Sequence, residues 1–289
     1  MSAQGKSVTL RTLSRMKAEN SKIAMITAYD YPSAKLAEAG GADLLLVGDS
    51  LGMVVLGYDS TVPVTMDDMI HHTRAVTRGS QRALVVADLP FLTAHLDREE
   101  VLKAAGRLMQ EGGARAVKVE GGEAVLPGIR ACTAAGIPVM GHIGLTPQSV
   151  HQLGGYRIQG KDAETAQRLL EEARQLEKAG AFALVLECVP DEVAAWITRS
   201  LSIPTIGIGA GVNCDGQVLV YHDLLQYGSE IQPSFVKTYA QLGEIAVQGI
   251  RNYVQEVREG SFPGEKHTFR APAVVDYLTG ERKNDSCRE

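Results

Sequence analysis

The sequence predicts an α/β fold, a single (β/α)8 TIM barrel. Eight short and nearly continuous apolar runs recur along the 289 residues, as expected of strands buried on both faces of a parallel sheet. Amphipathic helical patterns separate most of these runs, and such alternation predicts parallel strands joined by right-handed crossovers. The length agrees with this fold, because barrels of about 250 residues or more form one domain.

The expected elements follow the chain in order. Strands are expected over 23–27, 43–48, 83–87, 115–119, 137–141, 182–186, 204–208 and 217–221. Helices are expected between them over 33–39, 66–78, 99–110, 124–135, 162–178 and 191–200. Several helices end in a small-residue signal before the next strand, as in EAGGAD and EKAGAF, which is typical of a repeated βα unit.

Residues 1–289 are expected to form one domain, since no shift in composition marks a linker. From about Thr238 the pattern is that of one long helix, and residues 274–289 are expected to be a polar tail prone to disorder. An open, doubly wound sheet is the alternative architecture. No GxGxxG motif follows the first expected strand, however, so the usual dinucleotide fingerprint is missing.

Composition argues against several classes of partner. The net charge is −5 and Lys and Arg do not cluster, whereas nucleic-acid binding needs a basic face. No window of about 18 uncharged apolar residues suggests a membrane span, and the N-terminus has no apolar signal region. The four cysteines are widely separated and form no CxxC motif, so we expect reduced thiols and a cytoplasmic protein.

Acidic residues fall where the expected strands end. Asp49, Asp88, Glu120 and Glu187 each come at such a position. Taken singly, each is more often a helix cap or a surface acid. Carboxylates that converge on one barrel rim repel one another unless a cation holds them, and oxygen ligands favour Mg²⁺, Mn²⁺ or Ca²⁺ over zinc. We therefore expect a divalent-metal site with Asp49 and Asp88 as direct ligands and Glu120 as a direct or water-bridged ligand.

Two further polar residues lie near these acids. Lys118 is two residues from Glu120 on one strand, so both side chains share a face. Lys118 is expected to form a buried ion pair, to contact a substrate carboxylate or enolate oxygen, or to form a Schiff base. His142 follows the fifth strand as a structural residue or a substrate contact. The glycine-rich stretch 207–211 either binds phosphate or permits close packing.

Long blocks of the chain resemble the ketopantoate hydroxymethyltransferase family. The likeness is carried by the segment Thr27–Gly79 with VGDSLGMVVLGYDSTVPVT, and by DLPF, AVKVEGG, GHIGLTPQSVHQLGGYRIQGK, LVLECVP and IPTIGIGAGVNCDGQVLVYHDLL. It covers roughly residues 7–270. The chain departs from the family pattern at Gln226–Gly228 and beyond about Ala273, which bears on loop shape and assembly rather than on the acidic residues.

The resemblance implies an activity and a set of partners. The family transfers a hydroxymethyl group from 5,10-methylenetetrahydrofolate to 3-methyl-2-oxobutanoate and so forms 2-dehydropantoate, the first committed step toward pantothenate and coenzyme A. Its barrel is related to the phosphoenolpyruvate mutase and isocitrate lyase superfamily and is usually assembled as a homodecamer. A small 2-oxo acid, a folate and Mg²⁺ are therefore the expected partners of this chain, with no nucleic acid and no membrane.

The resemblance also divides the acids between two roles. The family's metal ligands match Asp49, Asp88 and Glu120, and its general base matches Glu187. Its substrate contacts match residues at the same rim, namely Asp49, Ser50, Asp88 and Lys118, to which His142 is added here as a hydrogen-bonding residue. Because the family substrate carries no phosphate, the 207–211 stretch is then read as a close-packing turn.

Two rival functions belong to other classes. One is an Mg²⁺-dependent lyase or mutase of the same superfamily acting on 2-oxo acids, but the reactive Cys of a KKCGH-type loop has no counterpart here. The other is a non-catalytic barrel that serves as a binding or assembly subunit. The intact metal, lysine and base positions argue against this second reading.

Overall fold

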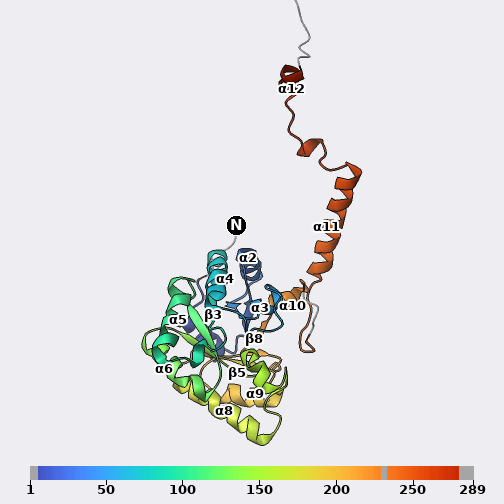
Figure 1. Ribbon diagram of the computed structural model, residues 1–289. Helices are drawn as coiled ribbons and strands as arrows, with labels where there is room; N and C mark the ends of the chain where they lie inside the picture. Colours follow the sequence, from blue (N-terminus) through green and yellow to red (C-terminus); the bar gives the residue numbers. More distant parts are fainter. Residues whose placement is uncertain (1–5, 229–232, 280–289) are drawn as a thin grey trace, which may run out of the picture. The chain divides into compact units, whose positions relative to one another are not determined.

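The computed structural model describes residues 6–228 and 233–279 (Figure 1). The chain divides into two compact units, Met1–Ala240 and Gln241–Glu289. The first unit contains the sheet. Whether the chain acts as one domain stays a prediction.

The predicted barrel is confirmed. Eight parallel strands close in sequence order, with β8 paired to β1. The strands are β1 Ile23–Thr27, β2 Leu44–Val47, β3 Leu84–Asp88, β4 Ala116–Glu120, β5 Val139–Gly144, β6 Ala183–Glu187, β7 Thr205–Ile208 and β8 Gly216–Leu219. Every residue of β2, β3 and β4 is buried, which explains why these strands have no polar alternation.

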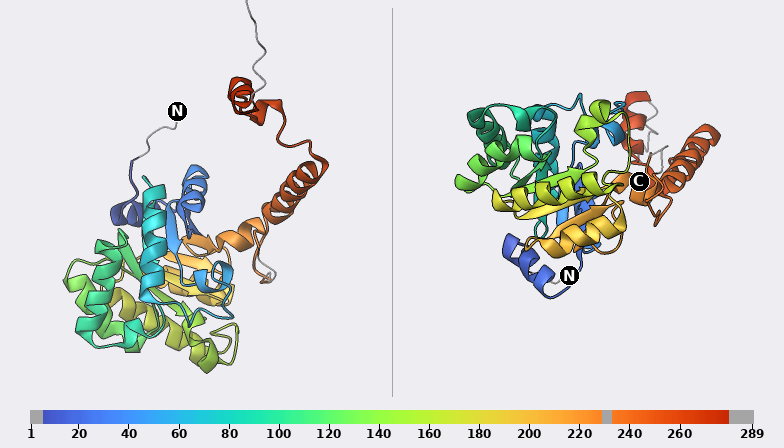
Figure 2. Two further views of the ribbon diagram at one scale, coloured as in Figure 1. Left: turned by 45° about the horizontal axis from the view of Figure 1, so that its top comes forward. Right: turned by 90° about the horizontal axis from the view of Figure 1, so that it is seen from below.

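The six expected helices follow the first six strands and surround them (Figure 2). They are α2 Tyr31–Ala39, α4 Met66–Gly79, α5 Arg98–Gln110, α6 Leu126–Ala134, α8 Ala163–Lys178 and α9 Asp191–Ser200. Short helical pieces lie in the connections: α3 Leu51–Val54, η1 Thr93–His95, η2 Glu123–Val125, η3 Pro147–Ser149, α7 Val150–Leu153 and α10 Tyr221–Leu225. No helix separates β7 from β8 within the described residues 209–215.

An additional helix, α1 Leu10–Ala18, packs at the N-terminal ends of the strands. Its Leu13 and the preceding Val8 join the cluster that fills the barrel interior, together with Ile23 and Leu84. Thr9 begins the helix as a side-chain N-cap. This element was not expected from the sequence.

The register brings the functional residues to one end of the barrel. Asp88 is paired with Lys118, Glu120 with His142, and Gly144 with Glu187. Strands β3, β4 and β6 end at the acidic residue itself, one residue later than expected. Because the strands are parallel, their C-terminal ends share the rim at which barrel enzymes build their sites.

The opposite end is tied by side chains from the last turns of the helices. Glu38 of α2 accepts hydrogen bonds from the main-chain N–H groups of 81–83 before β3. Glu177 of α8 accepts from the N–H groups of 202 and 203 before β7. Thr77 and Thr133 donate to carbonyl groups before β4 and β6. Each tie joins one helix to the loop that precedes a neighbouring strand.

The second unit contains α11 Leu242–Glu259, η4 Glu265–His267 and α12 Pro272–Thr279. The long helix agrees with the pattern seen from about Thr238, and α12 covers the first part of the segment expected to be a tail. Residues 280–289 lie outside the described part. Among the described residues, no helix is long and apolar enough to span a membrane. Cys132, Cys188 and Cys214 are free thiols, and Cys287 falls outside the described residues.

Candidate active site

Three carboxylates meet at the C-terminal end of the barrel. Asp49 follows β2, and Asp88 and Glu120 are the last residues of β3 and β4. One oxygen from each lies within 4.8 Å of the others. Their side chains are almost completely buried, with exposed fractions of 3%, 2% and 5%. The convergence expected from strand order is therefore present.

Local backbone geometry fixes the position of Asp49. Its main-chain N–H donates to Oδ2 of Asp88 at 3.1 Å, which links the ends of β2 and β3. Gly48 makes room for the Ser50 side chain, because a Cβ at position 48 would lie 2.8 Å from Oγ of Ser50. The Ser50 hydroxyl shares a 2.9 Å hydrogen bond with the buried phenol of Tyr29 from the end of β1. Ser50 therefore lies at the same rim as the carboxylates.

Lys118 supplies a positive charge to the cluster. Its Nζ lies 3.2 Å from Oδ1 of Asp88 and 3.3 Å from Oε1 of Glu120. Burial alone would lower the pKa of Lys118, but the charges of Asp88, Glu120 and Asp49 raise it above its ordinary value. The ammonium group therefore stays charged, which favours the ion-pair and substrate-contact readings over a Schiff base, because imine formation needs a neutral amine.

The buried carboxylates differ in their tendency to ionise. Burial raises the pKa of Asp49 well above its usual value, and the charges of Glu120 and Asp88 raise it further. Burial also raises the pKa of Asp88, and Lys118 offsets only part of this effect. Burial alone would raise the pKa of Glu120, but Lys118 and His142 lower it to about 2. Without a further cation, protonation of Asp49 and Asp88 is therefore favoured, and a bound cation would compete with protons for these carboxylates.

This donor set fits a hard divalent cation. Oδ1 of Asp88 is buried and accepts no hydrogen bond within the part of the chain that the structure describes. Its one charged neighbour among these residues is the Lys118 ammonium at 3.2 Å, so a single positive group faces three adjacent carboxylates that a divalent cation could share. Three carboxylates without Cys or paired His select Mg²⁺ or a similar ion rather than zinc.

His142 links the carboxylate cluster to Glu187. Its Nε2 lies 3.2 Å from Oε2 of Glu187, and Nδ1 lies 3.4 Å from Oε1 of Glu120 and 3.0 Å from Nζ of Lys118. The Lys118 ammonium favours a neutral ring, whereas the two carboxylates favour a protonated one. Burial and Lys118 lower the pKa of His142, but Glu120 and Glu187 outweigh them and raise it to about 9.

Glu187 stands apart from the three convergent carboxylates and is the most open of the four acids. Its side chain is 15% exposed, compared with 2% for Asp88. The next residue, Cys188, has a left-handed backbone with φ of 49°, which is costly for a side chain other than glycine. Across the strand pair, Gly144 has φ of 95°, and a Cβ there would collide with the main-chain oxygen of Glu187. These two residues set the turn that presents Glu187 at the rim.

One residue at the centre of the site was missed by sequence reasoning. Gln148 in η3 donates from Nε2 to Oδ2 of Asp49 at 2.7 Å, and its main-chain N–H donates to Oε2 of Glu120 at 3.1 Å. An amide does not titrate and is not a preferred metal ligand, so a search for acids, bases and ligands passes over it. Its place in the idiosyncratic GHIGLTPQ block was the available signal.

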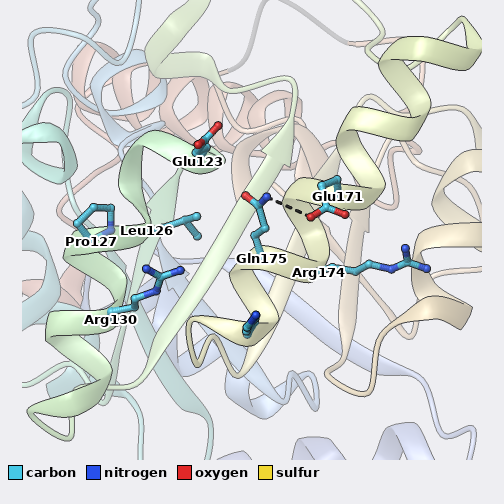
Figure 3. Close-up of a pocket in the computed structure, with 8 residues that line it drawn as sticks. Glu123, Leu126, Pro127, Arg130, Glu171, Arg174 and Gln175 are labelled. Carbon is cyan, nitrogen blue, oxygen red and sulfur yellow. Dashed lines mark hydrogen bonds between the residues drawn. The ribbon is translucent and has the colours of Figure 1, made fainter.

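Several other features near the barrel have structural roles or lie apart from the site. His72 contacts the main-chain oxygen of Tyr29 through Nδ1. In the 207–211 stretch, Gly211 has φ of 76°, and a Cβ there would collide with Asp191, which agrees with a close-packing turn. A groove of about 510 Å³ lies outside the barrel between α6 and α8 (Figure 3). None of the four acids lines that groove, so it is separate from the candidate site.

Comparisons with known proteins show the family of the chain. The profile described as ketopantoate hydroxymethyltransferase matches residues 7–265. A 3-methyl-2-oxobutanoate hydroxymethyltransferase from Carboxydothermus hydrogenoformans is 61% identical over 272 residues, which cover 94% of this chain and 99% of that protein. A protein of the same name from Moorella thermoacetica is 58% identical over 268 residues, 93% of this chain and 100% of that protein.

Solved structures show a similar fold. A phosphonopyruvate hydrolase, solved as a complex with oxalate and Mg²⁺, aligns with a TM-score of 0.59 and 16% identity over 94% of this chain and 95% of that one. A 2,3-dimethylmalate lyase of the phosphoenolpyruvate mutase and isocitrate lyase superfamily gives a TM-score of 0.56 and 16% identity over 96% of both chains. At this identity the likeness concerns the fold alone.

Proposed function

The chain belongs to the ketopantoate hydroxymethyltransferase family, and on that premise we propose that it transfers a hydroxymethyl group to 3-methyl-2-oxobutanoate. The observation that carries the proposal is the division of the buried acids. Three converge as a cation site, while Glu187 stands apart and is joined to them by His142. The one-carbon donor is 5,10-methylenetetrahydrofolate, and the product is 2-dehydropantoate.

Asp49, Asp88 and Glu120 would hold the divalent cation, with Mg²⁺ as the ion that suits three hard oxygen ligands. When bound there, the ion would act as a Lewis acid toward the keto group of the substrate. The three carboxylates would balance the charge of the ion, and their burial would limit the access of water to it. Their burial strengthens every electrostatic contact at this end of the barrel.

Lys118 and Ser50 are proposed to bind the 2-oxo acid. The Lys118 ammonium lies among the carboxylates and stays charged, so it can contact a substrate carboxylate or the oxygen on which negative charge develops. The Ser50 hydroxyl, oriented by Tyr29, offers a hydrogen bond at the same rim. Asp49 and Asp88 complete the substrate contacts. Nε2 of His142 lies 3.2 Å from the Glu187 carboxylate, and the protonated ring would orient this carboxylate electrostatically.

Glu187 is proposed as the general base. The proton to be removed is on the carbon next to the ketone, and it becomes acidic enough only when the resulting enolate is stabilised. Glu187 lies at the end of β6, on the side of His142 away from Glu120, and takes this proton at a carboxylate oxygen. The enolate carbon then forms a bond to the methylene carbon of the cosubstrate, whose two C–N bonds to the folate break. Water supplies the hydroxyl oxygen of the product, and tetrahydrofolate leaves. General bases of this kind contribute roughly 10²–10⁴-fold in rate.

Exchange of the substrate proton tests the assignment of the base. Glu187→Gln keeps the shape of the side chain but removes its basicity, so exchange of the C3 proton into D₂O should fall by about 10²–10⁴-fold. Binding of 3-methyl-2-oxobutanoate should persist. Glu192→Gln, an exposed residue in the first turn of α9, is the matched control and should exchange normally. Exchange at the wild-type rate in Glu187→Gln would remove Glu187 from this role.

Product formation tests the proposed reaction as a whole. The purified protein with Mg²⁺ should form 2-dehydropantoate from 3-methyl-2-oxobutanoate only when 5,10-methylenetetrahydrofolate is present. Addition of EDTA should stop the reaction, and added Mg²⁺ should restore it. Undiminished turnover in EDTA would contradict the metal assignment. Cleavage of a 2-oxo acid without folate would instead indicate a lyase.

A homo-oligomer is also proposed, with the decamer implied by resemblance as the expected size. The second unit supports association, because α11 has no buried residue and exposes Ile245, Ile250 and Tyr253. Exposed apolar side chains on one helix are typical of a contact surface. Light scattering coupled to size-exclusion chromatography should give a mass far above the 31.0 kDa of one chain. A monomer at micromolar concentration would contradict this proposal.

A further inference from the structure

The amide of Gln148 joins the ends of three barrel strands. The side chain is buried, with 8% of its surface exposed. Nε2 donates to Oδ2 of Asp49 at 2.7 Å and to the main-chain oxygen of Leu89, the residue after Asp88, at 2.9 Å. The main-chain N–H of Gln148 donates to Oε2 of Glu120 at 3.1 Å. One residue therefore contacts two of the carboxylates and the neighbour of the third.

The orientation of this amide is fixed by its partners. A carboxylate oxygen and a carbonyl oxygen only accept hydrogen bonds, so the nitrogen of the amide must face both. Rotation of the side chain would leave two buried acceptors unpaired, each at a cost of about 1–3 kcal/mol. The backbone is held as well, since the N–H of Leu145 donates to the main-chain oxygen of Glu187 at 2.8 Å.

We propose that Gln148 is a positioning residue that holds Asp49 and Glu120 in the orientation in which they converge with Asp88 on a divalent cation. By engaging Oδ2, the amide leaves Oδ1 of Asp49 for the ion and prevents the carboxylate from turning toward Lys118. The proposal rests on the metal site proposed above. Loss of residues that orient metal ligands typically weakens metal binding about 10–100-fold.

Replacement by methionine isolates the contribution of the side chain. Gln148→Met keeps the length of the side chain and the main-chain N–H to Glu120, but it removes both amide donors. The Kd for Mn²⁺, measured by electron paramagnetic resonance of the free ion, should rise about 10–100-fold. The Mg²⁺ concentration that gives half-maximal activity should rise in parallel, whereas kcat at saturating Mg²⁺ should stay close to that of the wild type. A merely structural role would lower kcat or stability without changing the Kd in this way.

Ser149→Ala provides the matched control, because Ser149 is the next residue of η3 and its side chain forms no hydrogen bond within the described residues. Its Kd for Mn²⁺ should equal that of the wild type. Gln148→Asn is a second variant in case the methionine does not fold. It retains an amide but withdraws the nitrogen by one methylene group, so its Kd should also rise.

The outcomes separate this inference from the proposed function. A wild-type Kd for Mn²⁺ in whichever Gln148 variant folds would overturn the positioning role, while leaving the metal site intact. Failure of the wild-type protein itself to bind Mn²⁺ would overturn the metal site, and with it this inference. A raised Kd in the Gln148 variants together with a normal Kd in Ser149→Ala supports the proposal.

Discussion

Lys118 and the proposed cation would contact the same carboxylates, so removal of the lysine should be partly compensated by metal. Nζ of Lys118 lies 3.2 Å from Asp88 and 3.3 Å from Glu120. At an effective dielectric constant of about 20, each contact corresponds to about 5 kcal/mol of Coulomb attraction before desolvation is counted. Measured losses on breaking a buried pair are smaller, about 3–5 kcal/mol. We therefore expect Lys118→Met to lose about 3–5 kcal/mol of stability without metal.

Thermal unfolding with and without Mg²⁺ measures this compensation. For a barrel of this size, about 2–4 °C of Tm corresponds to each kcal/mol, so the metal-free variant should melt roughly 6–20 °C below the wild type. A ligand at 100 times its Kd stabilises the folded state by about 2.7 kcal/mol. The shift caused by Mg²⁺ should be larger in Lys118→Met than in the wild type, because the dication becomes the only counter-charge of the carboxylates besides His142.

The control for this experiment is Lys103→Met, an exposed lysine on α5 that lies outside the site. It should melt with the wild type under both conditions. If metal-free Lys118→Met loses less than about 1 kcal/mol of unfolding free energy, the ammonium is not the main counter-charge of the buried carboxylates. Equal stabilisation by Mg²⁺ in the variant and the wild type would refute the idea that lysine and cation share the same carboxylates.

Three further predictions concern single residues. Asp49→Asn removes a proposed metal ligand, so the Mg²⁺ concentration for half-maximal activity should rise about tenfold or more in a metal titration. An unchanged titration would exclude Asp49 as a ligand. Gly144→Ala introduces a Cβ against the main-chain oxygen of Glu187, so kcat should fall while circular dichroism still shows a folded barrel; normal kcat would mean that the turn is not needed. Burial alone would raise the pKa of Glu38, but the N–H of Ala83, the Ser80 hydroxyl and the N–H groups of Arg82 and Gln81 lower it to about 2. The carboxylate therefore contributes stability above its unfolded pKa near 4.5 and loses it as the pH falls toward 2. For this half-buried group we expect about 1–2 kcal/mol after solvent screening, so Glu38→Gln should be less stable than the wild type in urea at pH 7, and the difference should shrink between pH 4.5 and 3. A difference that does not change with pH would contradict the ionic origin of the effect.

The barrel could be predicted from sequence because its strands are buried on both faces. Such strands appear as continuous apolar runs, and all eight were placed within a few residues of their observed bounds. The ends were less certain, since Asp88, Glu120 and Glu187 continue the ladder although they are charged. Charged residues can stand at these strand ends because their partners on neighbouring strands and the proposed cation balance them. A short stretch of sequence reveals neither the partners nor the cation. Helix α1 was missed because its role depends on packing at the barrel floor.

The site was predictable where its chemistry depends on residue type. Acids at successive strand ends predicted the convergence of Asp49, Asp88 and Glu120, which the geometry confirms. The contact between His142 and Glu187, by contrast, depends on which atoms face each other across β5 and β6, and spacing alone does not reveal it. The role of Gln148 depends on spatial contacts in the same way, and only its place in the GHIGLTPQ block could have drawn attention to it. Its importance comes entirely from the two carboxylates that it touches.

The ties at the floor of the barrel have a consequence for how its stability is distributed. Glu38 and Glu177 hold different loops and share no hydrogen-bonding partner. Each side chain joins one helix to the loop before a nearby strand. As in repeat proteins, the stability of the barrel can therefore be treated as a sum of contacts between neighbouring βα units. The losses caused by Glu38→Gln and Glu177→Gln should therefore add in the double variant. None of these ties involves the four acids at the opposite rim, so substitutions at the floor should change stability without moving the carboxylates.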